Sequence, residues 1–259
     1  KEYWQRGNKY LDEEKYNLAI NDFTHAINLS EYIYYEYHYN RGEAYYFTDQ
    51  YKLALDDYNK AFKIDETSQV LYSIGSVHGS LGNYSEAIKN FSECIKKDPY
   101  HDWAYYDRGR LKSINGEYRS AINDLNKFIK VKADFFYAYY YRGLSYSFLG
   151  DKNNRTEAGY YRDALENYKT ALELNPNPNN DIFLYIGEAY LVQEKYRKAL
   201  ENLNHYINNV DEGKEDAYAY FLRALVKDEL RKDHCSDFNK CCELGDLDCC
   251  NELTDYNCN

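Results

Sequence analysis

Small and large apolar residues recur along this chain at spacings that predict pairs of amphipathic helices. The motif Tyr-x-x-Ala, followed by Ile or Leu, occurs six times, and its alanines stand 33 to 43 residues apart. A glycine precedes most of these alanines by twelve residues, and a large apolar residue follows each of them by four. A fixed period close to 34 residues is typical of stacked helical repeats. The six alanines are Ala19, Ala54, Ala87, Ala121, Ala164 and Ala199.

The recurrent glycines predict that neighbouring helices approach each other closely. Each unit holds two helical stretches joined by a short polar turn, such as residues 81–83. Glycine inside a helix costs about 1 kcal/mol relative to alanine, so a glycine in the same place in six units indicates a helix packed against it. Two such helices cannot bury their apolar faces alone, and the units must therefore stack. These glycines are Gly7, Gly42, Gly75, Gly109, Gly143 and Gly187.

The repeat resembles a known family once several positions are read together. The first unit has Tyr3, Gly7, Tyr10, Tyr16, Ala19, Phe23 and Ala26. This spacing is similar to that of the tetratricopeptide repeat (TPR) family, and the Arg-Gly pairs at 41–42 and 108–109 resemble its bacterial-type variants. The match covers about residues 1–230 and departs from the family at Phe128 and Tyr206, where a small residue is expected. The resemblance implies an all-α, right-handed α-solenoid of about seven helix pairs.

We expect the solenoid to cover residues 1–232 as one array, with a cysteine-rich cap over residues 233–259. The repeats lie near 1–34, 35–67, 68–101, 102–135, 136–178, 180–213 and 217–244. The fifth repeat contains an inserted loop, 150–159, between its helices. Such insertions project from one face and are often functional, although a tolerated surface loop is the other interpretation.

Composition excludes some classes of partner. The formal net charge is −11, which argues against nucleic-acid binding, because a basic stripe is its first requirement. No apolar run approaches the roughly 18 residues that span a membrane. The 33 tyrosines exceed what the repeat positions need. They either form contact surface, where tyrosine gives a large area at low entropic cost, or replace Leu and Phe throughout.

Six of the seven cysteines lie in the last 25 residues: Cys235, Cys241, Cys242, Cys249, Cys250 and Cys258. A metal site fits poorly, because there is no Cys-x-x-Cys pair and only His234 is close. A helical hairpin turning at Gly245 would pair Cys235 with Cys258 and the first cysteine doublet with the second, leaving the pairing within the doublets open. The segment also resembles the cysteine-bearing tails of some exported bacterial TPR proteins.

Disulfides persist in oxidising compartments, so we expect a periplasmic, cell-surface or secreted protein. The chain contains no methionine and starts inside a helical pattern, which is compatible with a removed export signal. Cys94 occupies a small-residue position and is expected to be a buried thiol. Two Asn-x-Ser/Thr sequons, at Asn83 and Asn154, fall in predicted turns and are candidates for glycosylation.

Nothing in the sequence indicates an enzyme. The six histidines have no metal-ligand spacing, and the glycines belong to the repeat rather than to a phosphate loop. We expect no cofactor and no metal. We expect instead a scaffold that acts through protein–protein contacts.

The resemblance implies that the first helices of the pairs line a concave groove. Residues three positions before the recurrent glycine would form an aromatic ladder there: Trp4, Tyr39, Tyr72, Tyr106, Tyr140 and Phe221. Asn8, Asn40 and Arg110 would add polar groups. Such a ladder suits a protein partner or an extended peptide, but the rings could equally be core residues between adjacent first helices.

The family's carboxylate clamp for acidic chaperone tails is not expected. Asn8 and Asn40 match its asparagines, but Trp4, Gln69 and Ser73 stand where the clamp has basic residues. A structural subunit that self-assembles head-to-tail into a filament is the alternative function, because an array leaves an unfilled face at its end. The acidic residues of the cap, including Asp246 and Asp248, argue against it.

Overall fold

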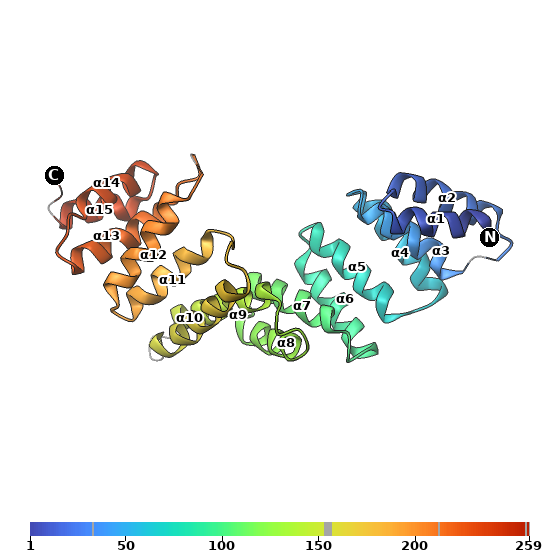
Figure 1. The fold of residues 1–259 in the computed structure, drawn as a ribbon, viewed down its shortest axis with the longest axis horizontal. Helices are drawn as coiled ribbons and strands as arrows, with labels where there is room; N and C mark the ends of the chain where they lie inside the picture. Colours follow the sequence, from blue (N-terminus) through green and yellow to red (C-terminus); the bar gives the residue numbers. More distant parts are fainter. Residues whose placement is uncertain (33, 153–156, 212, 257, 259) are drawn as a thin grey trace. The chain divides into compact units, whose positions relative to one another are not determined.

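The computed structural model describes residues 1–32, 34–152, 157–211, 213–256 and 258, and these form fifteen α-helices and no strands (Figure 1). The first eight helices are α1 (Glu2–Asp12), α2 (Tyr16–Leu29), α3 (Tyr35–Tyr46), α4 (Tyr51–Ile64), α5 (Ser68–Ser80), α6 (Tyr84–Lys97), α7 (Asp102–Ile114) and α8 (Tyr118–Val131). The remaining seven are α9 (Phe136–Lys152), α10 (Glu157–Leu174), α11 (Asp181–Val192), α12 (Tyr196–Asn208), α13 (Ala217–Glu229), α14 (Cys235–Glu243) and α15 (Leu247–Asp255). The predicted all-α class is confirmed.

The chain divides into two compact units, Lys1–Val131 and Lys132–Asn259. Unit 1 contains the helix pairs α1/α2 to α7/α8, and unit 2 contains α9/α10 to α13/α14 together with α15. Within each unit, a helix packs on its own partner and on the first helix of the next pair. The prediction of one array over residues 1–232 stays a prediction.

The recurrent glycines lie where the predicted close contact occurs. A Cβ atom added at Gly75 would stand 2.7 Å from Cε1 of the Phe91 ring, and one at Gly7 would stand 2.7 Å from Cε1 of Phe23. Each ring belongs to the second helix of the same pair and is buried. The glycine therefore makes room for the large residue that follows the recurrent alanine. The other pairs are Gly42 with Tyr58, Gly109 with Leu125, Gly143 with Tyr168, and Gly187 with Leu203.

The fifth pair differs from the expected loop at residues 150–159. Residues 150–152 continue α9, and residues 157–159 begin α10, so most of the extra residues lengthen the two helices. Gly150 is buried, and a Cβ atom there would stand 2.8 Å from Cε2 of Tyr161. This glycine thus packs against a ring instead of forming a turn. Residues 153–156, which include the sequon residue Asn154, lie outside the described residues.

A repeated ion pair also joins the two helices of a pair. Arg41, which precedes Gly42, donates from Nε and Nη2 to the carboxylate of Asp57 at 2.6 and 2.8 Å. Asp57 is buried, so this bidentate pair sits inside the array. Arg41 also donates from Nη1 to Oγ1 of Thr24 on α2, at 3.0 Å. One guanidinium therefore fastens the second helix of its own pair and that of the preceding pair.

The same arrangement recurs with Arg108, Asp124 and Ser92, and with Arg223, Asp237 and Asn204. The third and sixth pairs have isoleucine and asparagine at the two positions instead: Ile74 with Asn90, and Ile186 with Asn202. Both asparagines donate to a backbone carbonyl of their own helix. Arginine and aspartate therefore occur together or are both replaced in these pairs.

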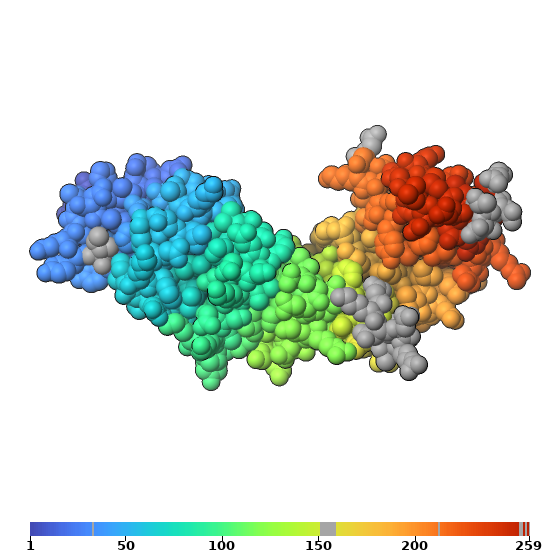
Figure 2. All heavy atoms as spheres, turned by 180° about the vertical axis from the view of Figure 1, so that it is seen from behind, coloured from blue at the N-terminus to red at the C-terminus, as the bar shows by residue number. Residues whose placement is uncertain are grey.

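The cysteine-rich cap is a disulfide-bonded helical hairpin, as predicted. Cys235 is bonded to Cys258, Cys241 to Cys249, and Cys242 to Cys250. These bonds determine the pairing that the sequence left open within the doublets. The cap lies against the preceding helices of unit 2, as the red and orange surface of Figure 2 shows, and the Arg223–Asp237 ion pair joins α13 to α14.

Candidate functional site

The predicted ladder residues of unit 1 are part of the packing between helices. Tyr39 lies 5.5 Å from the Tyr58 ring, measured between ring centroids, and Tyr72 lies 5.5 Å from Phe91. Tyr106 is only 8% exposed, and its ring centroid is 5.1 Å from that of Phe128. Each ring therefore stabilises its own helix pair, whichever partner its edge also meets.

The hydroxyl groups of these tyrosines connect successive first helices. Tyr39 on α3 donates to Oε1 of Glu43 at 3.0 Å and lies 3.2 Å from Oγ of Ser73 on α5. Tyr72 on α5 donates to Oδ2 of Asp107 on α7 at 2.8 Å. A chain of side-chain hydrogen bonds therefore runs along α3, α5 and α7. We call this surface the first-helix face; it comprises the side chains of Tyr39, Glu43, Tyr46, Tyr72, Ser76, Ser80, Asp107 and Arg110.

Two carboxylates on the first-helix face have unusual acidity. Burial raises the pKa of Glu43, although hydrogen bonds from the Tyr39 and Tyr58 hydroxyls act to lower it. Burial likewise raises the pKa of Asp107, against the opposing effects of Tyr72 and Arg110. The Arg110 guanidinium lies 3.4 Å from Oδ1 of Asp107. The face thus presents partly desolvated acids beside hydroxyls rather than a strong charge of one sign.

A polar hollow of about 280 Å³ opens on the first-helix face. Its lining comes from α3, α5, α6 and α7 and consists of Tyr46, Tyr72, Ser76, Gly79, Ser80, Phe91, Asp107 and Arg110. Tyr46 and Ser80 are joined there by a hydrogen bond of 3.2 Å between their hydroxyls. Hydroxyl, carboxylate and guanidinium groups on successive helices can bond the N–H and C=O groups of an extended peptide.

The remaining polar candidates in unit 1 lie beside this face. Asn40 donates from Nδ2 to Oδ1 of Asn8 at 2.6 Å, which links α3 to α1. Trp4 packs near Tyr37, with 6.0 Å between ring centroids. The two clamp positions in α5 are occupied by neutral side chains, Gln69 and Ser73, which both bond Tyr39.

The ladder residues of unit 2 lie in its interior packing. Tyr140 is 6.4 Å from Tyr168 and 6.5 Å from Tyr185, between ring centroids. Phe221 is 6.2 Å from Phe238, which is fully buried on α14. Phe221 therefore connects α13 to the cap.

Sequence reasoning missed Ser76, Ser80 and Asp107. Their signal was positional: polar side chains at corresponding places on consecutive first helices. The sequence ranked aromatic residues above them because rings carry more contact area.

Several other candidates can be located in the structure. Among the described residues, two groups of His, Cys and Asp side chains come within ligand distance of one another, but their cysteines are the disulfide-bonded ones. Asn83 is exposed at the start of α6, and its glycosylation stays a prediction. Cys94 is buried, which raises the pKa of its thiol to about 12. In the part of the chain that the structure describes, no helix is both long and apolar enough to cross a membrane.

Antiparallel helix pairs, stacked through close glycine contacts and connected along their first helices, define a helical-repeat protein. Three segments match sequence models of the tetratricopeptide repeat, namely residues 35–68, 68–101 and 155–209. The chain belongs to the tetratricopeptide repeat superfamily. No curated protein matches the sequence.

Solved structures share the fold at low sequence identity. A part of a TPR protein from Cytophaga hutchinsonii is 18% identical, with a TM-score of 0.67, and the match covers 96% of this chain and 99% of that one. A TPR protein from Parabacteroides merdae is 18% identical, with a TM-score of 0.63 and coverage of 95% and 93%. YrrB, described as a TPR protein with an unusual peptide-binding site, is 22% identical, with a TM-score of 0.60 and coverage of 72% and 91%.

Proposed function

We propose that this protein is a non-enzymatic scaffold that binds an extended segment of a partner protein on its first-helix face. The fold supports protein–protein interaction, since TPR proteins are generally scaffolds without catalytic activity. The observation that carries the proposal is the polar hollow across α3, α5 and α7. Its groups alternate between donors and acceptors along successive helices, as an extended main chain requires. The peptide-binding site named for YrrB is consistent with this use of the fold.

Site-specific photo-crosslinking in the source cells tests the proposal. A photoreactive amino acid at Ser76, inside the hollow, should form covalent adducts with a partner protein. The same amino acid at Lys89, an exposed residue of α6 outside the lining, is the matched control and should form none. Arg110→Glu should then reduce the adducts from Ser76. Equal adducts from both positions would contradict a specific site.

We also propose that the protein works outside the cytoplasm. Three disulfides in one short cap support this, because such bonds persist in oxidising compartments. Alkylation of the native protein under non-reducing, denaturing conditions should modify Cys94 alone. Modification of all seven cysteines would contradict the proposal.

Self-association, including head-to-tail filament formation, is a second candidate function. Exposed tyrosines favour it: Tyr32 is 72% exposed and Tyr100 is 92% exposed. Large exposed aromatic side chains supply contact area at interfaces. Light scattering on the oxidised protein measures the mass directly. A mass that stays monomeric at high concentration would exclude this candidate.

A further inference from the structure

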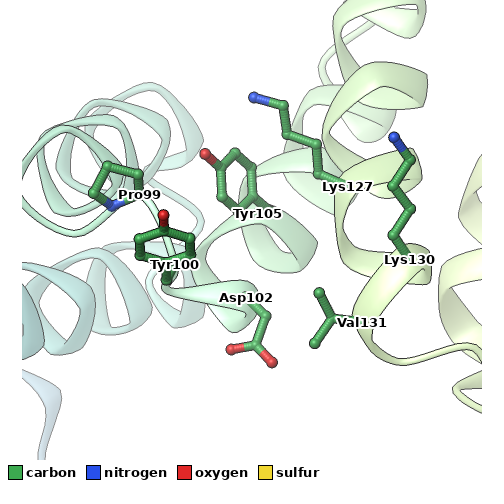
Figure 3. A pocket seen from close by; sticks show the side chains of 7 residues that line it. All are labelled: Pro99, Tyr100, Asp102, Tyr105, Lys127, Lys130 and Val131. Carbon is green, nitrogen blue, oxygen red and sulfur yellow. The ribbon is translucent and has the colours of Figure 1, made fainter.

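A second hollow lies in unit 1, away from the first-helix face. Its volume is about 360 Å³, and its lining comes from the loop before α7, the first turn of α7 and the last turns of α8. Figure 3 shows Pro99 and Tyr100 on one side, Lys127 and Lys130 on the other, and Tyr105 between them. The volume is within the range of sites that hold one or two side chains of a ligand.

The walls of this hollow are apolar and held in place. Tyr105 is buried and forms the inner surface, whereas Tyr100 is 92% exposed and Val131 is 66% exposed. The backbone N–H of Tyr100 donates to Oδ1 of Asp98 at 3.0 Å, and His101 Nδ1 accepts from the backbone N–H of Ala104. The loop that carries the exposed ring is thus fixed by hydrogen bonds, which lowers the entropic cost of binding.

The charges at the hollow are mainly positive in a strongly acidic protein. The ammonium group of Lys127 lies 4.7 Å from the centroid of the Tyr105 ring, a cation–π contact that orients it. Within the described ranges, neither Lys127 nor Lys130 has an ion pair with a carboxylate. Asp102 is the one acid in the lining, and in Figure 3 its carboxylate points to the opposite side from both ammonium groups.

Comparison with the other repeats shows that this combination is particular to the fourth pair. Lys127 and Lys130 stand 18 and 21 residues after Gly109, and the second pair has lysines at the same offsets from Gly42. There, however, Lys60 is paired with Asp56, and His38 replaces the tyrosine ring. The repeat framework therefore does not require the aromatic and cationic groups of the fourth pair.

We propose that this hollow binds a partner segment in which a carboxylate side chain stands next to an aromatic one. The aromatic ring lies against Tyr100, Tyr105 and Val131, and the carboxylate lies between Lys127 and Lys130. Burial of the ring supplies most of the affinity, because exposed ion pairs contribute little by themselves. The two ammonium groups select an acidic neighbour over a basic one. This site is separate from the first-helix face and does not depend on its function.

Backbone NMR on the full-length oxidised chain tests the proposal with a blocked Glu-Phe-Asp-Phe peptide at millimolar concentration. Amide signals of residues 99–105 and 127–131 should shift, and a blocked Lys-Phe-Lys-Phe peptide should leave them in place. The double variant Lys127→Glu/Lys130→Glu should weaken binding about tenfold through charge repulsion. Tyr100→Ser should weaken it several-fold without lowering the melting temperature, because that side chain is exposed.

Lys96→Glu is the matched control, since Lys96 stands 21 residues after Gly75 and is already paired with Glu93. This variant should bind the peptide normally. Equal binding of both peptides, absence of shifts at these residues, or an unaffected lysine double variant would overturn the proposal. Shifts confined to α3, α5 and α7 would support the first-helix face and reject this site. A change in mass caused by the lysine variants alone would show that a second copy of the chain occupies the hollow.

Discussion

Two glycines in α5, one helical turn apart, have different surroundings. A Cβ atom at Gly75 would stand 2.7 Å from the Phe91 ring, whereas one at Gly79 would stand 3.7 Å from Cδ1 of Leu111, an ordinary contact. Gly75→Ala should therefore destabilise the protein by about 1–3 kcal/mol through overpacking, even though alanine favours the helix. Urea unfolding measures this change.

Gly79→Ala is the control in the same helix, and it should be neutral or stabilising by up to about 1 kcal/mol. If both variants had the same stability, the close approach of Phe91 to α5 would not be what requires glycine at position 75.

Glu43 allows a prediction about pH. Burial raises its pKa in the folded chain, so ionisation at neutral pH opposes folding. The stabilising effect of the protonated form is complete below the unfolded pKa and is lost as the pH rises through the folded pKa. Glu43→Gln should consequently raise the melting temperature by a few degrees at pH 7.

The same variant should have little effect in acid, where Glu43 is already protonated. Its amide oxygen can still accept the hydrogen bonds from Tyr39 and Tyr58. Melting curves of both proteins over a pH series measure the difference. A stabilisation that is as large in acid as at neutral pH would point to a cause other than ionisation.

At the scale of single residues, the repeat period predicted the close contact of Gly75 but not the partners of Tyr72. The glycine meets a residue of its own pair, at a constant sequence distance of 16. The Tyr72 hydroxyl meets Asp107 of the next pair. That contact depends on how successive pairs are rotated, which the spacing of apolar residues does not specify.

Between elements, the Arg41–Asp57 ion pair is the joint with the clearest experimental consequence. Arg41→Ile should cost about 3 kcal/mol, because it leaves the buried Asp57 carboxylate without its bidentate partner. The double variant Arg41→Ile/Asp57→Asn reproduces the residues of the third and sixth pairs. It should recover most of the lost stability, as urea unfolding would show. A double variant as unstable as the single one would mean that each pair needs its own chemistry.

The number and pairing of the helices followed from the sequence period, but this joint did not. Its signal was present as an arginine before the glycine and an aspartate before the large residue. Charged residues on helices are usually solvated, and the aspartate was therefore not distinguished from a surface residue. Gly150 was misplaced for a related reason, since a glycine that packs against a ring looks locally like a glycine in a turn.

For the whole molecule, the cap leads to a prediction about order of unfolding. Stability in a repeat array is approximately a sum of local terms, so loss of the disulfides should act first on the elements they join. Reduction should increase hydrogen exchange in α13, α14 and α15 well before α1 to α4. Exchange that rises uniformly along the chain would contradict this expectation. The unreduced protein, treated with the same buffer, is the control.

The sequence predicted the cap as a hairpin but not the pairing within its cysteine doublets. Adjacent cysteines project in different directions from a helix, and the choice depends on the rotation of α15 about its own axis. Packing of Phe238 and Tyr256, whose ring centroids lie 5.1 Å apart, is part of what defines that rotation.

The isoleucine at position 74 divides the fastenings of unit 1 into two kinds. Arginine hydrogen bonds lower the pKa of Asp22, and those of Arg41 and His38 lower that of Asp57 despite its burial. Their contribution is present above the unfolded pKa and disappears as the pH falls through the folded value. The joint between α5 and α6 contains Ile74 and Asn90, neither of which titrates. Mild acid will therefore loosen the first two pairs while the third keeps its fastening, so the array has an acid-resistant segment in its middle.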